Sequence, residues 1–190
     1  MTPEQIQHAR LRADAKLGYA QIHLQLLREN GGNGGTDFDR ALQESFLFHL
    51  LGAKDALLQE MNAYYALGLE PTSVTAGKLQ DKIKQRGPRS EELAELHVLE
   101  VDAESWLSHA KQMRDHCTHV AGLARAYHLG GANHHKVFLK NPTTGTDIEI
   151  HVLEAFEQWL AAMTGLLNGM RDSAITRNVA PPAAQAWHQA

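Results

Sequence analysis

The chain of 190 residues contains a single cysteine, Cys117, so it cannot form an intrachain disulfide, and a reducing cytosol is the expected setting. No apolar run approaches the ~18 residues that a bilayer requires, and the first residues lack the basic-then-apolar pattern of a secretory signal. We therefore expect a cytoplasmic protein. The net charge of −4 argues against nucleic-acid binding through a general basic field, but it leaves room for a local basic pocket.

Two chemistry-bearing motifs are also missing. The glycine-rich stretch 31–35 follows no predicted strand and precedes no Lys-Ser or Lys-Thr pair, so it predicts a connection between helices rather than a phosphate-binding loop. A Glu-x-x-His motif, which di-iron bundles place on paired helices, occurs nowhere in the chain. We accordingly expect no cofactor and no bound metal.

Apolar residues recur every three or four positions over most of the chain, which predicts long amphipathic helices. The predicted helices span about 3–30, 36–67, 73–85, 91–129 and 152–170. Their expected N-caps are Thr2, Thr36, Thr72 and Ser90, and Asp39 completes a capping box with Thr36. The apolar stripe of the fourth helix includes Ala103, Cys117 and Tyr127, so Cys117 is interpreted as a small buried residue rather than a nucleophile.

The spacing of apolar residues changes from helical to strand-like before the last predicted helix. Val137–Leu139 and Asp147–Ile150 flank a turn in which Pro142 and Gly145 suit the required backbone angles, so a β-hairpin is expected over about 136–150. The predicted fold class is all-α, an up-and-down bundle of about five helices with a hairpin before the last one. We expect a single domain over 1–174 and a flexible C-terminal tail over 175–190.

The fourth predicted helix carries Arg114-Asp115-His116-Cys117-Thr118-His119. An arginine, a polar residue, a short spacer and a histidine are the motif of catalytic members of the HEPN superfamily. The order of long helices, one short helix, a motif-bearing helix, a hairpin and a closing helix also resembles that superfamily, over residues 3–172. The resemblance implies a metal-independent endoribonuclease that acts on RNA as a toxin or phage-defence effector, and it allows an antitoxin protein as a partner.

The resemblance also implies roles for individual residues. His119 would accept the proton of a ribose 2′-OH, and the oxygen would attack the adjacent phosphate to leave a 2′,3′-cyclic phosphate. Arg114 would bind the phosphate and stabilise the charge of the transition state. Asp115 would orient these groups, and His116 would act as an auxiliary acid. Lys111 and Arg125 would add positive charge for substrate binding.

Helix geometry sets a condition on this site. At ~100° per residue, Arg114 and His119 lie ~140° apart around an ideal helix, so they do not share a face. Either the helix breaks or begins near Arg114, or residues from two chains combine. HEPN enzymes pair two such motifs, so we expect a homodimer through the motif-bearing helix.

Three other interpretations of the same residues remain open. A polar stripe is one, because residues seven positions apart share a helix face. A metal site is another, since His116 and His119 are one turn apart and could recruit further ligands from that stripe. The third is a non-catalytic module that binds nucleic acid, nucleotide or protein, which the acidic net charge favours. The stripe consists of Glu95, Asp102, His109 and His116.

Overall fold

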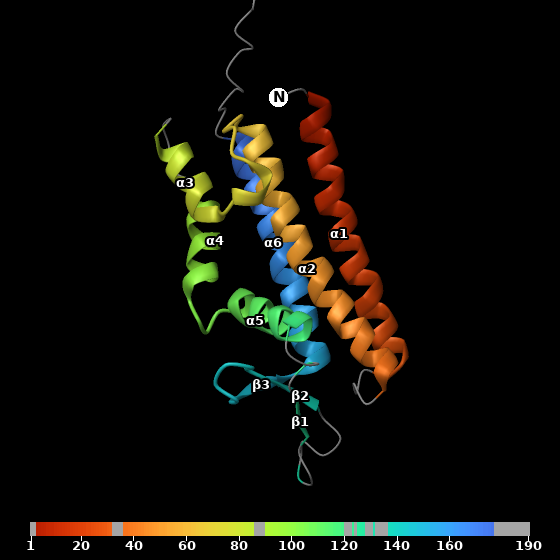
Figure 1. Ribbon diagram of the computed structural model, residues 1–190. Helices are drawn as coiled ribbons and strands as arrows, with labels where there is room; N and C mark the ends of the chain where they lie inside the picture. The colour runs from red at the N-terminus through yellow and green to blue at the C-terminus, as the bar shows by residue number, and fades with distance from the viewer. Residues whose placement is uncertain are drawn as a thin grey trace, which may run out of the picture.

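The computed structural model describes residues 3–31, 36–85, 90–119, 123, 125–127, 131 and 137–176. This part of the chain forms six α-helices, one 3-10 turn and a three-stranded antiparallel sheet, which confirms the predicted fold class (Figure 1). No helix within these ranges is long and apolar enough to cross a bilayer. The elements are α1 (Pro3–Glu29), α2 (Asp37–Tyr64), η1 (Pro71–Ser73), α3 (Ala76–Lys84), α4 (Glu91–Val101), α5 (Trp106–His119), β1 (Arg125–Tyr127), β2 (Val137–Lys140), β3 (Asp147–His151) and α6 (Val152–Thr176).

Helix α2 forms the centre of the fold. Its N-terminus closes the predicted capping box, because the Asp39 N–H donates to Thr36 Oγ1 and the Asp39 carboxylate accepts from the Thr36 N–H. Helix α1 runs beside α2 on one side, and α6 lies behind it (Figure 1). Phe46 of α2 stacks on Phe156 of α6 with ring centroids 4.3 Å apart, and both side chains are fully buried. Packing on two sides explains why α2 is so rich in apolar residues.

The third helix begins at Ala76 rather than directly after Thr72, so the predicted cap is wrong. Its N-cap is Thr75, whose Oγ1 accepts from the Lys78 N–H at 3.2 Å. Thr72 instead lies in the η1 turn that Pro71 begins, and the chain becomes extended again before the helix can start. The predicted cap at Ser90 is confirmed by the bond from the Leu93 N–H at 3.3 Å, and Thr2 lies outside the described residues.

The predicted helix 91–129 is not continuous, which corrects the sequence interpretation. It breaks after Val101 because Asp102 and Ser105 satisfy backbone groups in the gap. The Ser105 side chain donates to the Leu99 carbonyl and accepts from the Ser108 N–H at 3.0 Å, so it ends α4 and starts α5. Ala103, which the apolar stripe placed inward, is exposed in this break.

The sheet contains one strand more than the predicted hairpin. The hairpin itself is confirmed, since β2 and β3 pair antiparallel and Gly145 has a φ of +72° in the turn. The additional strand β1 pairs antiparallel with β2, with Tyr127 opposite Val137. Tyr127 is therefore 57% exposed in a strand, and its predicted place on the helical stripe is wrong. The sheet lies at the end of the bundle next to α5 (Figure 1), where Thr143 Oγ1 of the turn donates to Gln112 Oε1 at 3.1 Å.

Helix α6 closes the fold and extends to Thr176. Its Arg171 side chain is only 10% exposed and joins three helices. It bonds to Glu60 of α2 at 2.8 Å and to Asp14 of α1 at 2.7 Å. Residues 177–190, most of the predicted tail, lie outside the described residues, and the single-domain boundary at 174 stays a prediction.

Candidate functional site

Helix α5 carries the predicted catalytic motif and packs one side against α2. Leu107, Ala110 and Met113 form this buried side, because residues three apart share a helix face. At about 100° per residue, Arg114 lies within about 20° of Leu107 on the side that faces α2, whereas His119 lies on the opposite side of the helix. Helix α5 is continuous through the motif, so a helix break does not bring Arg114 and His119 together in one chain.

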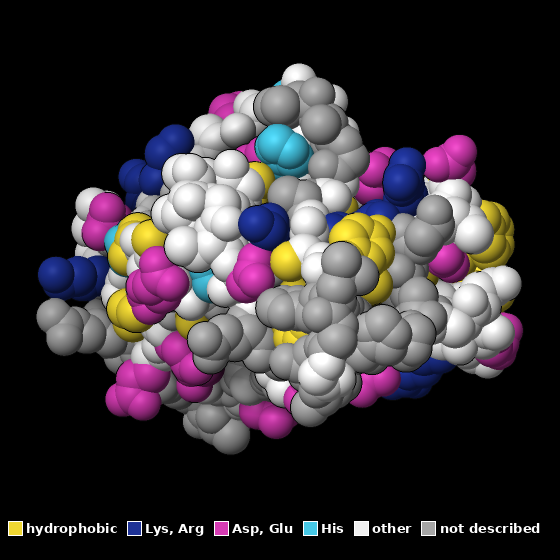
Figure 2. Space-filling model, turned by 90° about the horizontal axis from the view of Figure 1, so that it is seen from below, with side chains coloured by type: hydrophobic (Ala, Val, Ile, Leu, Met, Phe, Trp, Pro, Cys, Tyr) yellow, Lys and Arg dark blue, Asp and Glu magenta, His cyan; other side chains and the backbone are white. Residues whose placement is uncertain are grey.

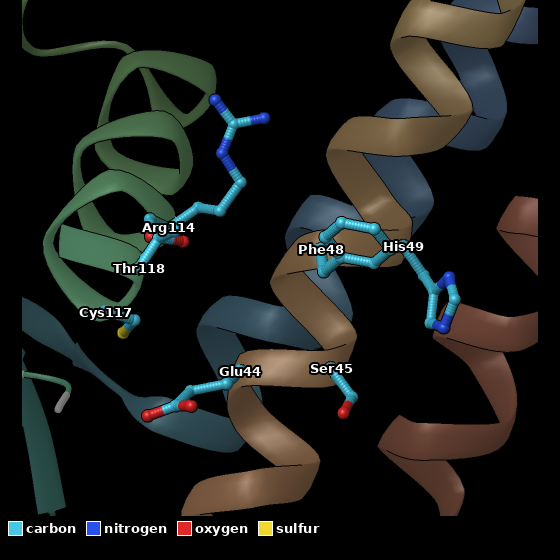
Figure 3. A pocket seen from close by; sticks show the side chains of 7 residues that line it. All are labelled: Glu44, Ser45, Phe48, His49, Arg114, Cys117 and Thr118. Carbon is cyan, nitrogen blue, oxygen red and sulfur yellow. The ribbon is translucent and has the colours of Figure 1, made fainter.

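Arg114 lines a pocket of about 250 Å³ between α5 and α2 (Figure 3). In Figure 3 its side chain extends from α5 into the space beside α2, and His49 points toward α1. The Glu44 side chain of α2 is directed toward α5 below Cys117 (Figure 3). The pocket is lined by Glu44, Ser45, Phe48 and His49 from α2 and by Arg114, Cys117 and Thr118 from α5.

A second pocket, of about 530 Å³, shares Arg114 and Phe48 with the first and reaches across α2 to α1. We call the two pockets together the α1–α2–α5 groove. Cations line it from both sides, with Arg12 and Lys16 on α1 and Arg114 on α5. Phe48 lies between them and is 58% exposed, so its ring is open to a ligand in the groove. The remaining residues that line the second pocket are His8, Ala9, Gly52, Asp55, Ala56, Gln59 and Pro71.

The Arg114 guanidinium has one ion-pair partner among the described residues, its neighbour Asp115. Arg114 Nε and Nη2 donate to the same Asp115 oxygen at 3.0 and 2.7 Å. The side chains are 31% and 44% exposed, so the pair is open to solvent. This contact is local to α5 and joins no other element, so the guanidinium can exchange it for a ligand at little cost to the fold.

The other predicted site residues line neither pocket of this groove, although Arg125 is close enough to Cys117 for its charge to oppose the rise in the pKa of that thiol. His119 is exposed, His116 is half-buried and Lys111 is exposed, and none of them lines either pocket. Arg125 lies on β1, where its Nη2 donates to Oε1 of the buried Gln43 at 2.7 Å. Within one chain, Arg114 is therefore the member of the predicted set that lines the groove, and Asp115 is its ion-pair partner.

The break between α4 and α5 also divides the predicted polar stripe. Glu95 lies on α4, and Asp102 is the C-cap of that helix. His109 and His116 follow on α5, so the four side chains do not form one line and the stripe is a wrong prediction. Among the residues that the structure describes, no group of three or more histidine, cysteine or acidic side chains is placed to hold a metal ion.

Comparison with known proteins gives one result. A family model described as "Family of unknown function (DUF6586)" matches residues 8–175. The chain belongs to this family. No curated protein matches the chain, and no solved structure matches it. The match spans the bundle and the sheet without assigning DUF6586 to the HEPN superfamily, so the HEPN resemblance stays a prediction.

Sequence reasoning missed a cluster on α1 and α2 beside the groove of this DUF6586 protein. Lys16 Nζ lies 3.4 Å from His49 Nδ1 and 4.7 Å from the centroid of the Phe48 ring. His23 stacks on His49 with ring centroids 5.3 Å apart, and Tyr19 meets His49 edge-on at 5.2 Å. A pattern in the sequence could have indicated it, because one face of α1 repeats basic and aromatic residues at helical spacing. This face carries His8, Arg12, Lys16, Tyr19 and His23.

Burial favours the neutral form of both stacked histidines, and nearby positive charge adds to this effect at His49. Desolvation lowers the pKa of His49, and the nearby charges of Lys16 and His23 lower it further. Burial alone lowers the pKa of His23. An ammonium has no acceptor, so Lys16 donates to His49 Nδ1 and the ring proton lies on Nε2. His49 is thus a neutral hydrogen-bond donor at pH 7 on the wall of the groove.

Cys117 lines the groove but is a poor nucleophile. Burial raises the pKa of its thiol to about 11, and the carboxylate of Glu44 adds to the increase. The side chain is half-buried and packs against the core, which agrees with its place on the predicted apolar stripe. Cys117 is therefore a poor candidate for a nucleophile in this groove.

The described residues at the sheet end of the molecule form no basic patch. Figure 2 shows this end, where acidic and basic side chains of the described residues are interspersed rather than gathered by sign. Lys140, for example, pairs with Asp147 of the neighbouring strand at 3.6 Å. The α1–α2–α5 groove is therefore the better candidate for binding an anion.

Proposed function

We propose that this protein binds single-stranded RNA in the α1–α2–α5 groove. The observation that carries the proposal is the position of Phe48, an exposed aromatic ring that lies between Lys16 and Arg114 in a continuous hollow. Proteins that bind single strands combine cations along the backbone with aromatic rings on which bases stack. This groove presents both features within a few residues.

Each contact has a defined chemical role. The Arg114 guanidinium matches the geometry of a phosphate and would exchange the exposed Asp115 carboxylate for it. Lys16 would contribute a point charge, and the His49 Nε2–H would donate a neutral hydrogen bond. Phe48 would stack on a base, which only an unpaired strand can offer. RNA is preferred over DNA because the resemblance carried by the motif on α5 implies it.

The charge distribution sets limits on affinity. Acidic Glu44 and Asp55 also line the groove, and the chain is acidic overall. Contacts to about three phosphates would give a plot of log affinity against log salt with a slope of about −2. We therefore expect modest affinity that depends clearly on salt.

Binding can be measured by fluorescence anisotropy with a labelled single-stranded RNA of about 12 nucleotides. Phe48→Ala and Arg114→Ala should each weaken binding about tenfold, because each removes a contact worth about 1.4 kcal/mol. Matched controls lie on the same helix as Phe48. Phe38 is 54% exposed outside the groove, and Arg40 forms an exposed ion pair with Asp37 at 3.2 Å. Equal losses in Phe38→Ala and Arg40→Ala, or no losses in any variant, would exclude the groove as the binding site.

A second candidate function is metal-independent cleavage of the bound RNA by a homodimer. It is favoured by the opposite directions of two motif residues, since Arg114 enters the groove while His119 is exposed at the end of α5. In a dimer through α5, His119 of one copy would take the 2′-OH proton and Arg114 of the other would hold the phosphate. His116 would return a proton to the departing 5′ oxygen. A toxin or phage-defence role belongs to this candidate alone.

Mixing two variants tests this shared site directly. Arg114→Ala and His119→Ala should each cleave RNA at least about 100-fold more slowly than wild type in the presence of chelator. If the site combines two chains, mixing the variants restores part of the activity, because every mixed dimer contains one intact site and one site that lacks both residues. No recovery on mixing would contradict the two-chain site, and equal cleavage by wild type and both variants would exclude the motif.

A further inference from the structure

The first pocket of the α1–α2–α5 groove contains a carboxylate that the proposed contacts to phosphate do not use. Glu44 lines this pocket together with Phe48, and its side chain is directed toward α5 (Figure 3). A negative charge in a groove that holds phosphate weakens binding, because like charges repel. A role for Glu44 in binding therefore has to involve a part of the ligand other than its phosphates.

The Glu44 carboxylate is half-buried and has no partner within the described part of the chain. It forms no hydrogen bond and no ion pair with a described residue. Arg114, which lines the same pocket, is paired with Asp115 instead. Cys117 supplies no counter-charge, because its thiol, whose pKa is raised to about 11, is neutral at pH 7. Both oxygens of Glu44 are thus free to accept hydrogen bonds from a ligand.

The position of Glu44 relative to Phe48 suits the reading of a stacked base. The two residues are four apart on α2, so their side chains are neighbours on one face of the helix. Lys16 lies over the Phe48 ring from α1, with its Nζ 4.7 Å from the ring centroid. Of the two pockets, Lys16 lines the second and Glu44 lines the first. A base on the opposite face of the Phe48 ring would therefore lie in the first pocket, with one edge toward Glu44.

The Watson–Crick edges of the four bases differ in what they offer to a carboxylate. Guanine presents two adjacent donors, N1–H and the N2 amino group, which match the two oxygens of one carboxylate. Adenine and cytosine each present one amino group beside a ring nitrogen that only accepts. Uracil presents one N–H between two carbonyl oxygens. The acceptors on these three bases repel a carboxylate, so guanine is its best partner.

We infer that Glu44 makes the groove selective for guanine, with the base stacked on Phe48 and its N1–H and N2–H groups donating to the two Glu44 oxygens. This inference rests on the proposed function, because the groove must bind RNA before a base in it can be read. Arg114 would hold a neighbouring phosphate at the same time. A base without the two donors leaves the carboxylate unpaired, which is how a site built for N–H donors rejects other ligands.

The test is fluorescence anisotropy with labelled uridine RNAs of about 12 nucleotides that carry one guanine, adenine, cytosine or inosine at the centre. Wild type should bind the guanine RNA at least about tenfold more tightly than the adenine or cytosine RNA. The inosine RNA should lie between them, because inosine lacks the N2 amino group. Glu44→Gln should abolish the preference, since an amide has only one acceptor oxygen. It should also bind the adenine RNA slightly more tightly than wild type, because a negative charge has left the groove.

Asp55→Asn is the matched control, since Asp55 lies on the same helix, lines the second pocket and loses the same charge. It should tighten the binding of every RNA to a similar extent and keep the preference for guanine. Equal affinity of wild type for all of these RNAs would overturn the inference and leave the proposed RNA binding intact. So would a guanine preference that persists in Glu44→Gln. Absence of binding to any RNA would instead overturn the proposed function, and the inference with it.

Discussion

Arg171 and Arg114 each form an ion pair with an aspartate at 2.7 Å, but the two pairs connect different parts of the fold. Arg171 is 10% exposed and joins α6 to Glu60 of α2 and Asp14 of α1. Arg114 is 31% exposed and pairs with the next residue of its own helix. A charge that joins three helices holds the fold, whereas a charge that joins none can be used for binding. Substituting each arginine in turn separates these two roles.

The largest effect is expected at the buried arginine. Arg171→Ala leaves Glu60, which is 4% exposed, without its bidentate partner inside the protein. Breaking a buried pair by removing one partner costs about 3–5 kcal/mol, which corresponds to a fall in melting temperature of about 10 °C for a chain of this size. Chemical denaturation of wild type and variant measures the difference. A loss below about 1 kcal/mol would mean that the pair behaves as a surface ion pair.

The same substitution at the groove arginine should barely affect the fold. Arg114→Ala removes a solvent-exposed pair within one helix, so the free energy of unfolding should change by less than about 1 kcal/mol. Its effect should appear in RNA binding instead. The contrast is informative only if both variants are measured under the same buffer and salt, and a large loss of stability in Arg114→Ala would remove the distinction between the two arginines.

The sequence predicts a structural feature well when the residues that form it are close together in the chain. The capping box of Thr36 and Asp39 is set by four consecutive residues, and it is confirmed. The Arg114–Asp115 contact is equally local. The break at Ser105 was missed because Ala103 happens to continue the apolar period, although a serine that can cap a helix stands at the break.

The remaining misses are non-local. Strand β1 has three residues, and its pairing with β2 comes from a segment ten or more positions away, so periodicity within the strand cannot indicate it. The contact between Lys16 and His49 depends on how α1 rotates against α2, which neither helix specifies alone. Sequence therefore located the motif on α5, but the groove that Arg114 enters required the packing of three helices.

The stacked histidines His23 and His49 should have a smaller effect on the free energy of unfolding, and only at low pH. They lie beside the groove, away from the buried ion pairs of Arg171. Both pKa values are lowered from the ordinary 6.5, so the unfolded chain binds more protons than the folded one as the solution is acidified. Stability should therefore be fully present above pH 6.5 and should fall as pH decreases below it. The double variant His23→Gln, His49→Gln should show a weaker loss on acidification than wild type, measured by urea unfolding at several pH values. The exposed His119→Gln serves as the control, and an unchanged pH dependence in the double variant would contradict this assignment.

The smallest effect is expected on the alkylation rate of Cys117 when Glu44 is substituted. It tests whether the Glu44 carboxylate is close enough to the thiol to raise its pKa. With a pKa of about 11, against the ordinary 9.0, the thiol should react with iodoacetamide roughly 100-fold more slowly than an unperturbed cysteine near pH 8. Burial is the main cause and the Glu44 carboxylate is a lesser one. Glu44→Gln should therefore accelerate alkylation only a few-fold, whereas Glu29→Gln, at an exposed site on α1, should leave the rate unchanged. Because alkylation reports on the thiolate alone, an equal rate in Glu44→Gln and wild type would show that Glu44 does not face Cys117 across the groove as Figure 3 depicts.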